Sequence, residues 1–567
     1  MASNWYVRRT NPEFVRYLAG ASSISTTTAQ VLINRGFKTP EEISDFFDAA
    51  ANKLSDPSLL PDVHKAAERI KEAAINGEKV LVHGDYDADG VTATAILLIT
   101  LRSLDIKCDY FIPNRFRHGY GFNTEAIRVA KEKGFGLIIT VDCGITSFNE
   151  AEEARSAGVD LIITDHHEPQ RDIDGMPKRP VALAVVNPKL RPDVELPLCG
   201  AGIALKLAYL LLGSDMSSAL FDLAAIGTVA DMVPLHGDNR IIARLGLELI
   251  NNDSRFAIEA LKDVSSLEGR KISAGLLGYS LIPRINATGR ISDASEAVEM
   301  LVSDNMDRVQ TIASELNSNN YKRQKIEEGV LREALSMLKG RPVESCIVLH
   351  NDDWHEGVIG IVASRLTDMF KRPSFVLSVK DGVATGSARS VSSLDICECL
   401  SGTEDILIRY GGHKQAAGLS LSTDMISDFR ERMISIVRER LGDEEPSDDL
   451  YIDAEVSLKD ITFPLMKELS KLEPFGTGNE EPVLAARDLE VVSPRVVRKN
   501  HLKMKLRFDS YTLDAIWFNK GDVLQRLIEP GKFDAAFIPS INEWGGGKSL
   551  QLTVKDIRPS VVKEENL

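Results

Sequence analysis

The chain has 567 residues, more than one compact core of about 100–200 residues accommodates, so three or four domains are expected. With 43% hydrophobic and 26% charged residues and no low-complexity tract, the composition is that of a globular protein and excludes a fibrous or wholly disordered chain. The formal net charge of −16 excludes a surface that is basic throughout, so any path for nucleic acid is expected to be local.

The first predicted part, residues 1–55, carries no recognisable targeting signal. Its opening residues, MASNWYVRRT, lack the apolar stretch of a secretory signal. The longest apolar run in the chain, near Leu207–Leu212, is far shorter than the roughly 20 residues of a membrane helix. The six cysteines are scattered and form neither a disulfide framework nor a zinc-type pair. A cytoplasmic protein with no membrane association is expected.

Residues 56–305 are predicted to form an α/β domain. From about Val80 to Met232, short β-branched runs (VLVH, CDYFI, GLIITV and DLIIT) alternate with helical patterns. This order is typical of a doubly wound parallel sheet. Ligands of such sheets bind beyond the carboxyl ends of the strands, so the residues that follow VLVH, LIITV and LIIT are expected to meet in one crevice.

Acidic and histidine residues gather at the predicted strand ends and in one later apolar segment. They are His83, Asp85, Asp87 and Asp89 in HGDYDADG, Asp142 in TVDCG, Asp165, His166 and His167 in TDHH, and Asp231 in AAIGTVADMVP. Helix capping uses one acid of the first loop but not three, and an isolated charge in the last segment would be costly to bury. Mixed Asp and His ligands fit two divalent ions, Mn²⁺ or Mg²⁺, better than a structural zinc. Two such ions can clamp an in-line phosphoryl displacement, so hydrolysis of a phosphate ester or anhydride is predicted.

The next predicted parts are a connecting helix and a second α/β domain. Apolar spacing from Asp304 to Leu338 favours one long helix, assigned to residues 306–342. The segment CIVLHNDDWHEGVIGIVASRL reads as strand, turn and helix, and it opens a smaller α/β domain at 343–445. The acidic, proline-containing GDEEPSDD then reads as a linker.

The C-terminal part, residues 450–563, is predicted to be rich in short strands. Alternating patterns in HLKMKLRF, TLDAIWF, FDAAFIPS and SLQLTVKDI favour a small β-barrel of the OB-fold type. Six cations occur between Arg495 and Arg507 without a single acid. Such a run is either a solvated surface or a contact for nucleic acid, and the run alone does not decide between them.

The motifs HGDYDADG, TVDCG, TDHH and GGHKQAAG, in that order, resemble the DHH phosphoesterase superfamily. Within it, RFRHGYGFN, CGAGIALKLA, RINATGRI and GSARS resemble the RecJ family, and the resemblance covers nearly the whole chain. It implies a DHH domain, a long helix, a smaller DHH-associated domain and a barrel. It also implies a 5′-to-3′ exonuclease specific for single-stranded DNA, which releases 5′-mononucleotides in DNA recombination and repair.

The resemblance also implies roles for individual residues. The implied metal ligands are His83, Asp87, Asp89, Asp142, His166 and Asp231, with Asp142 bridging two ions and His83 included by position alone. The implied catalytic residues are Asp85, Asp142, His167 and His413, and Asp165 is expected to orient the histidines. The implied substrate contacts are Arg115, Arg290, Ser387, Arg389, Gly411, Gly412 and His413. For any one of these arginines taken alone, a surface salt bridge is an equal alternative.

Two other functions stay open. A small-substrate member of the superfamily, acting on a short oligonucleotide, a cyclic dinucleotide, adenosine bisphosphate or pyrophosphate, needs only the two lobes, so the additional β-rich module favours a polymer substrate. A non-catalytic DNA-binding scaffold is expected to lose metal ligands, and every metal position is retained here. The resemblance implies single-stranded DNA, a single-strand-binding protein and a helicase as partners, and a monomer.

Overall fold

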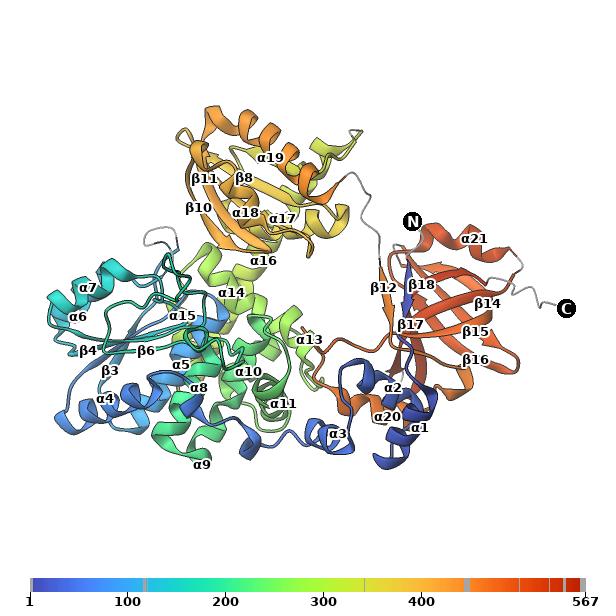
Figure 1. The fold of residues 1–567 in the computed structure, drawn as a ribbon, viewed down its shortest axis with the longest axis horizontal. Coiled ribbons are helices and arrows are strands. Elements are labelled where there is room, and N and C mark those ends of the chain that lie inside the picture. Colours follow the sequence, from blue (N-terminus) through green and yellow to red (C-terminus); the bar gives the residue numbers. More distant parts are fainter. Residues whose placement is uncertain are drawn as a thin grey trace.

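The computed structural model describes residues 4–115, 119, 121–340, 342–442, 449–498, 500–529, 531–543 and 547–560. Figure 1 shows two α/β lobes, at the lower left and the top, and a β-barrel on the right. The predicted fold class is confirmed. The acidic stretch 443–448, predicted as part of a linker, lies outside the described residues. In the described part of the chain, no helix is both long and apolar enough to cross a membrane.

The first lobe is built on a parallel sheet in the order β3-β2-β4-β5-β6. Its strands are β2 (Val80–His83), β3 (Cys108–Phe111), β4 (Leu137–Val141), β5 (Asp160–Thr164) and β6 (Ala184–Val186). The first four are the strands that the sequence predicts, and β6 is an addition. Their β-branched residues are buried on both faces, which is why the strands read as continuous apolar runs.

Helices cover both faces of this sheet. On one side pack α5 (Ala88–Ser103), α8 (Gly200–Leu212) and α10 (Phe221–Ala230). On the other side pack α6 (Thr124–Lys133) and α7 (Phe148–Ser156). The remaining helices of this lobe are α4 (Val63–Asn76), α9 (Ser214–Ser217), α11 (Gly237–Asn252), α12 (Phe256–Val264), α13 (Ala274–Leu276), α14 (Ile282–Ile291) and α15 (Ser295–Val302).

The predicted connecting helix is α16 (Met306–Leu338). Its first half contributes Val309, Ile312 and Leu316 to the core of the first lobe, whereas its second half contributes Val330 and Ala334 to the core of the second. The helix therefore belongs to both lobes and fixes their separation.

The second lobe contains a mixed sheet in the order β10-β11-β9-β8-β7. Its strands are β7 (Ile347–Asn351), β8 (Ser374–Lys380), β9 (Val383–Arg389), β10 (Leu407–His413) and β11 (Ala416–Ser422). Only β7 and β8 are parallel, and the other pairs are antiparallel. Its helices are α17 (Glu356–Phe370), α18 (Ile396–Ser401) and α19 (Ile426–Leu441).

The C-terminal strands form a closed five-stranded barrel. They are β14 (Leu484–Val497), β15 (His501–Phe508), β16 (Tyr511–Trp517), β17 (Phe533–Asn542) and β18 (Ser549–Pro559). They pair in the order β14-β15-β16-β18-β17, and β17 pairs with β14 to close the ring. Around them lie β13 (Ala454–Glu455), α20 (Phe463–Leu469) and α21 (Leu524–Ile528).

The N-terminal segment packs against this barrel, which the sequence does not indicate. Strand β1 (Trp5–Val7) pairs in parallel with β12 (Leu450–Ile452), far away in the chain. The helices α1 (Pro12–Ala21), α2 (Thr26–Asn34) and α3 (Pro40–Phe47) share a hydrophobic core with α20 and the barrel strands. Figure 1 shows these blue helices beside α20. The two ends of the chain thus form one structural unit.

Buried polar contacts attach this unit to the first lobe. The Arg240 guanidinium on α11 lies 3.7 Å from the Phe46 ring centroid and donates to the carbonyls of Phe46 and Leu472. The backbone N–H of Leu235 donates to the carbonyl of Thr477 at 2.8 Å. A buried arginine with three carbonyl acceptors is a rigid connection, so the barrel has a defined position relative to the first sheet.

Candidate active site

Acidic and histidine side chains meet at the carboxyl edge of the first sheet, as predicted. Three groups could each hold a metal ion, because their ligand atoms lie within 4.8 Å of one another. They are Asp85, Asp87 and Asp142; Asp142, His166 and His167; and Asp89, His166 and Asp231. Asp142 and His166 each belong to two groups, so the three form one continuous cluster. A carboxylate shared between two groups is what a ligand bridging two ions requires.

Asp87 and Asp89, which follow strand β2, are held by the N-termini of two helices. Asp87 caps α5, and its Oδ1 accepts the N–H groups of Asp89 and Gly90 at 3.0 Å each. Asp89 is buried and accepts the N–H of Gly200 at 2.6 Å and that of Ala201 at 2.8 Å, at the start of α8. These backbone donors fix the two carboxylates and partly offset their charge.

Asp142 lies where β4 ends and has a left-handed backbone, with φ of 62°. Its side chain is buried against the start of α8: a Cβ atom at position 200 would lie only 2.6 Å from Asp142 Cβ. Glycine at position 200 is therefore required for this close approach. Asp142 Oδ1 is 3.1 Å from His166 Nε2, yet neither atom makes a hydrogen bond within the described structure.

Burial and mutual repulsion disfavour the ionised form of the carboxylates in the cluster. Burial and the neighbouring Asp89 and Asp87 raise the pKa of Asp142 well above its ordinary value. Burial and Asp87 likewise raise the pKa of Asp85, and burial and Asp89 raise that of Asp231 to about 8. No lysine or arginine that the structure describes forms an ion pair with any acid of the three groups. Divalent cations bound by these oxygens would supply the missing charge, so the donor set fits Mn²⁺ or Mg²⁺.

Asp165 gives the two histidines different protonation states. Its carboxylate accepts a hydrogen bond from the ring Nδ1 of His167 at 2.7 Å. It also accepts from the backbone N–H of His166 at 2.7 Å and from that of Ile145 at 2.9 Å. Burial opposes its ionisation, but the hydrogen bond from His167 and the histidine charges lower the pKa of Asp165 to about 2. Burial also opposes charge on His167, but Asp165 raises the pKa of His167 to about 9. Burial and charged His167 lower the pKa of His166 to about 4, so His166 is neutral at neutral pH and offers a lone pair.

His83 and Asp85 lie in different surroundings at the edge of the sheet. The His83 ring is buried beside Phe111 and Phe122, with centroids 5.5 and 5.3 Å away, and its Nδ1 is 3.5 Å from Cys143 Sγ. His83 belongs to none of the three described groups, whereas Asp85, expected to act in catalysis rather than as a ligand, belongs to one. Both residues' roles stay predictions.

The predicted substrate-binding arginines gather between the two lobes. Arg290 on α14 donates to the carbonyl of Gly357 at the start of α17, at 3.1 Å. Arg389 donates to Ser387 Oγ at 3.0 Å, and the Arg115 guanidinium lies 5.6 Å from the Tyr86 ring centroid. Burial and the charges of Arg115, Arg323 and Arg389 lower the pKa of Arg290 to about 10. The guanidinium groups repel one another, so their charge is available to an anion.

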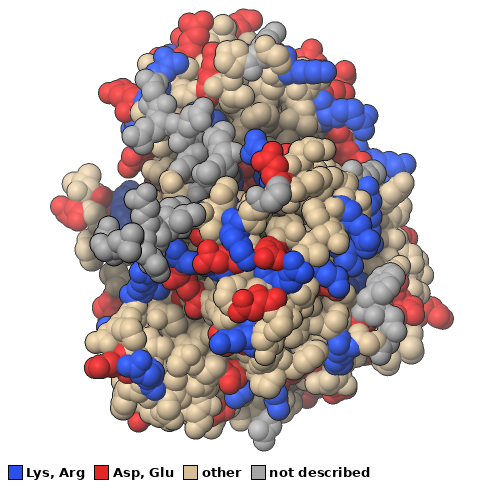
Figure 2. All heavy atoms as spheres, turned by 90° about the vertical axis from the view of Figure 1, so that its right-hand side faces the viewer, with Lys and Arg blue, Asp and Glu red and all other residues tan. Residues whose placement is uncertain are grey.

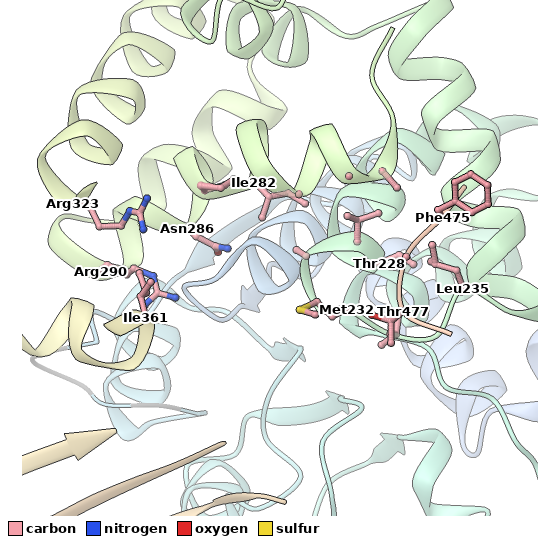
Figure 3. Close-up of a pocket in the computed structure, with 18 residues that line it drawn as sticks. Thr228, Met232, Leu235, Ile282, Asn286, Arg290, Arg323, Ile361, Phe475 and Thr477 are labelled. Atoms are coloured by element: carbon pink, nitrogen blue, oxygen red, sulfur yellow. The ribbon is translucent and has the colours of Figure 1, made fainter. Parts of the chain in front are cut away.

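Sequence reasoning missed Arg323, which projects from α16 close to Arg290 (Figure 3). It donates to Glu327 on the same helix at 2.7 Å. Its position within a long polar helical pattern gave no signal, because only the packing of α16 against α14 brings it to the cluster.

The glycine-rich motif of the second lobe reaches the cluster through His413. The His413 ring at the end of β10 stacks on His167, with centroids 6.2 Å apart and planes inclined by 16°. Gly412 has φ of 149°, and a Cβ there would lie 2.4 Å from the carbonyl oxygen of Ala416. A side chain at position 412 would therefore displace β10. Gly411 and Gly412 bring His413 from the second lobe against the first.

A cavity of about 460 Å³ adjoins the cluster (Figure 3). Ala230 and Met232, the neighbours of Asp231, line one wall, and Asn286 and Arg290 of α14 line another. Phe475, from the segment before the barrel, lies at the far end. Asn286 also accepts the N–H of Ala88 at 2.8 Å, so α14 supports the start of α5. The cavity therefore extends from the arginines, past the neighbours of Asp231, to the segment before the barrel.

Without metal ions, the cluster is expected to make the protein less stable as the pH rises from about 4 to about 8. Asp231 has a pKa of about 8 in the folded chain against 3.8 ordinarily, so the folded state binds more protons than the unfolded state in this range. The free energy of unfolding then falls with increasing pH, and bound cations oppose the loss. We expect Mn²⁺ to raise the melting temperature by at least about 3 °C more at pH 8 than at pH 6. Calorimetry in EDTA and in Mn²⁺ measures this difference, and equal increments at the two pH values would contradict the prediction.

Comparisons with known proteins identify the same three domains. Family models match the DHH family N-terminal domain at 79–228, the DHHA1 domain at 305–439 and the RecJ OB domain at 452–556. The chain is 39% identical over 560 residues to the single-stranded-DNA-specific exonuclease RecJ of Bacillus subtilis, covering 97% of this chain and 70% of that protein. It is 34% identical to the RecJ of Escherichia coli, covering 93% and 94%. The crystal structure of Thermus thermophilus RecJ with Mn²⁺ superposes with a TM-score of 0.85 at 31% identity, covering 98% of this chain and 80% of that one.

Proposed function

The chain belongs to the RecJ family of single-stranded-DNA-specific exonucleases, and from this premise we propose how its residues divide the reaction. The protein hydrolyses phosphodiester bonds of single-stranded DNA in the 5′-to-3′ direction and releases 5′-mononucleotides. The observation that carries the proposal is the shared position of Asp142 in two ligand groups, beside a cluster of arginines between the lobes.

Two divalent ions, Mn²⁺ or Mg²⁺, supply charge neutralisation and an activated water for attack on phosphorus when they are bound. We assign Asp87, Asp89, Asp142, His166 and Asp231 to hold them, with Asp85 as a further candidate. His166 suits this role because it is neutral at neutral pH. The backbone donors at the starts of α5 and α8 keep Asp87 and Asp89 in place.

The histidines facing the cluster act on the phosphate. His167 is charged at neutral pH because Asp165 holds its Nδ1 proton, so its other ring nitrogen can donate to a phosphate oxygen or to the leaving 3′-oxygen. His413 comes from the second lobe, stacks on His167 and lies on the same side of the site. Both lobes thereby contribute a histidine to the place proposed for the scissile phosphate.

The arginine cluster explains why cleavage starts at the 5′ end of the strand. Arg115, Arg290 and Arg389, with Ser387, are proposed to hold the terminal 5′-phosphate through bidentate contacts. A terminal phosphate anchored beside the metal cluster presents the first phosphodiester bond for attack. Hydrolysis there releases one 5′-mononucleotide, and the shortened strand again ends in a 5′-phosphate.

Cleavage of end-labelled single-stranded DNA tests the proposal, with Mn²⁺ or EDTA and with a duplex and a dinucleotide as controls. We expect mononucleotides from the 5′ end in Mn²⁺ only, with the duplex spared. Activity on the dinucleotide alone would move the protein to the small-substrate branch of the superfamily. DNA binding without any cleavage would make it a scaffold.

The barrel is proposed to hold single-stranded DNA, but only part of its basic run is available. Arg507 pairs with Glu490, and Lys505 lies 3.8 Å from Asp514. Arg495 and Lys503 are cross-strand partners on β14 and β15, and neither forms an ion pair in the part of the chain that is described. Figure 2 shows basic side chains lying among acidic ones on the barrel's side of the molecule, as these pairs lead one to expect.

Replacing both Arg495 and Lys503 by alanine is expected to weaken binding of single-stranded DNA about tenfold. The slope of log K against log salt concentration should become shallower by about 1.4, because two phosphate contacts are lost. Fluorescence anisotropy in EDTA measures the binding without cleavage. The control is Lys505→Ala/Arg507→Ala, which removes cations that acids already neutralise and is expected to have a smaller effect. An equal loss of DNA binding in both variants would show that the paired and the unpaired cations of the run contribute alike.

The cellular setting is also a proposal. We propose that the protein works in the cytoplasm as a monomer, on strands that a helicase exposes and a single-strand-binding protein covers. The support is chemical: a nuclease that spares duplexes needs an unwound substrate. Light scattering tests the monomer, for which a mass of 62.3 kDa is expected.

A further inference from the structure

The ribbon formed by β1 and β12 has one buried face and one exposed face. Trp5, Val7 and Leu450 pack against the core that includes Ile452. Because side chains alternate along a strand, Tyr6 and Tyr451 project from the opposite face, where they are cross-strand partners. Arg8 follows Tyr6 by two residues and projects from the same face.

The exposed face carries an aromatic platform. The Tyr6 and Tyr451 rings stack with centroids 5.4 Å apart and planes inclined by 24°, yet they stay 47% and 55% exposed. The Arg8 guanidinium lies 5.5 Å from the Tyr451 ring centroid. Stacked rings beside a guanidinium group offer flat surfaces for nucleobases together with a positive charge for a phosphate.

A cationic hollow adjoins this platform. It has a volume of about 470 Å³ and is lined by Arg8, Arg9 and Arg16, over a floor that includes Val7 and Val15. Glu455, the one acid in its lining, accepts from Arg9 at 3.1 Å and also pairs with Arg487 outside the hollow. In a chain with net charge −16, three arginines around one hollow are a local excess of positive charge that suits a sugar–phosphate backbone.

The ribbon is also placed on the side of the barrel that faces the two lobes. In Figure 1, β12 is the strand of the barrel unit closest to them. The buried contacts of Arg240 and the Leu235–Thr477 hydrogen bond fix that unit to the first lobe. The ribbon therefore has a defined position relative to the crevice.

We propose that Tyr6, Arg8 and Tyr451, with Arg9 and Arg16, form a second binding surface for single-stranded DNA. It holds the 3′ part of the substrate strand while the 5′ end occupies the crevice. The inference rests on the proposed function, because single-stranded DNA is the substrate. A contact remote from the reacting bond contributes to binding of long strands and not to the chemical step.

The double variant Tyr6→Ala/Tyr451→Ala tests this surface. For a strand of about 40 nucleotides we expect KM and Kd to rise about tenfold with kcat unchanged. For a strand of about six nucleotides, which is proposed to bind in the crevice alone, no change is expected. Tyr6→Phe/Tyr451→Phe should restore normal values because stacking does not need the hydroxyl groups. The control is Tyr17→Ala, an exposed tyrosine on α1 outside the lining of the hollow.

An unchanged KM for the long strand, or an equal loss for both lengths, would overturn the proposal, as would failure of the phenylalanine variant to restore binding. Loss restricted to a protein partner, with DNA binding intact, would assign the ribbon to that partner instead. If the unaltered protein cleaves neither strand, the proposed function itself fails, and the two failures are thereby distinguished.

Discussion

Replacing Asp142 by asparagine is expected to lower kcat on single-stranded DNA by at least about 1000-fold and to weaken metal binding. Asp142 shares its carboxylate between two ligand groups, so its loss affects both ions at once. Asparagine keeps the shape of the side chain and tolerates the left-handed backbone at φ of 62°, whereas alanine would add strain there. The measurements are single-turnover cleavage and Mn²⁺ titration calorimetry.

The matched control is Asp105→Asn, an exposed aspartate in the same left-handed conformation, with φ of 56°. It should leave both the turnover and the metal binding unchanged. Normal turnover by the purified Asp142→Asn protein, with an intact melting transition, would remove Asp142 from the metal site. Loss of turnover with normal Mn²⁺ binding would instead make Asp142 a group that acts on the substrate.

Replacing Arg389 by alanine is expected to lower kcat/KM about 100-fold for strands that carry a 5′-phosphate, and much less for strands that end in a 5′-hydroxyl. Arg389 donates to Ser387 Oγ and to the carbonyl of Ala388. It lies close enough to Arg290 for the two positive charges to repel each other. On the proposed role of this cluster, removing one guanidinium removes contacts that a strand ending in a 5′-hydroxyl does not make. Competition between the two kinds of substrate measures the preference directly.

Arg430→Ala serves as the control because Arg430 lies in the same lobe and pairs with Glu344 at the surface, at 3.2 Å. Surface pairs of this kind contribute little, so no change in the preference is expected. If Arg389→Ala reduced activity equally on both substrates, the arginine would contact the scissile region rather than the terminal phosphate.

The packing of the N-terminal segment changes how the barrel's role is tested. A truncation from about residue 450 would remove the barrel, and the sequence predicts a loss of DNA binding more than of chemistry. The structure shows that this truncation would also expose Leu18, Val31, Leu32 and Ile43, which pack into the same core as the barrel strands. Exposed apolar surface of that size promotes aggregation, so point variants on the barrel separate binding from folding more cleanly.

The motif residues and their chemistry could be predicted from the sequence because both depend on local patterns. Continuous β-branched runs identify parallel strands that are buried on both faces, and the carboxyl ends of parallel strands meet at one edge. Asp87, Asp142 and His166 were therefore expected together, and the structure brings them together. The alternating strands after residue 450 likewise indicated a barrel, although its closure through β14 and β17 was not readable.

What only the tertiary structure decided depends on contacts between segments far apart in the chain. His83 was among the predicted ligands, yet its ring packs beside Phe111 and Phe122, while Asp85 lies close to Asp142. Arg323 comes close to Arg290 only because α16 packs against α14. Tyr6 meets Tyr451 through a strand pairing between the two ends of the chain. A one-dimensional pattern fixes which face a side chain occupies, whereas its neighbours across the fold are set by packing, which the pattern does not encode.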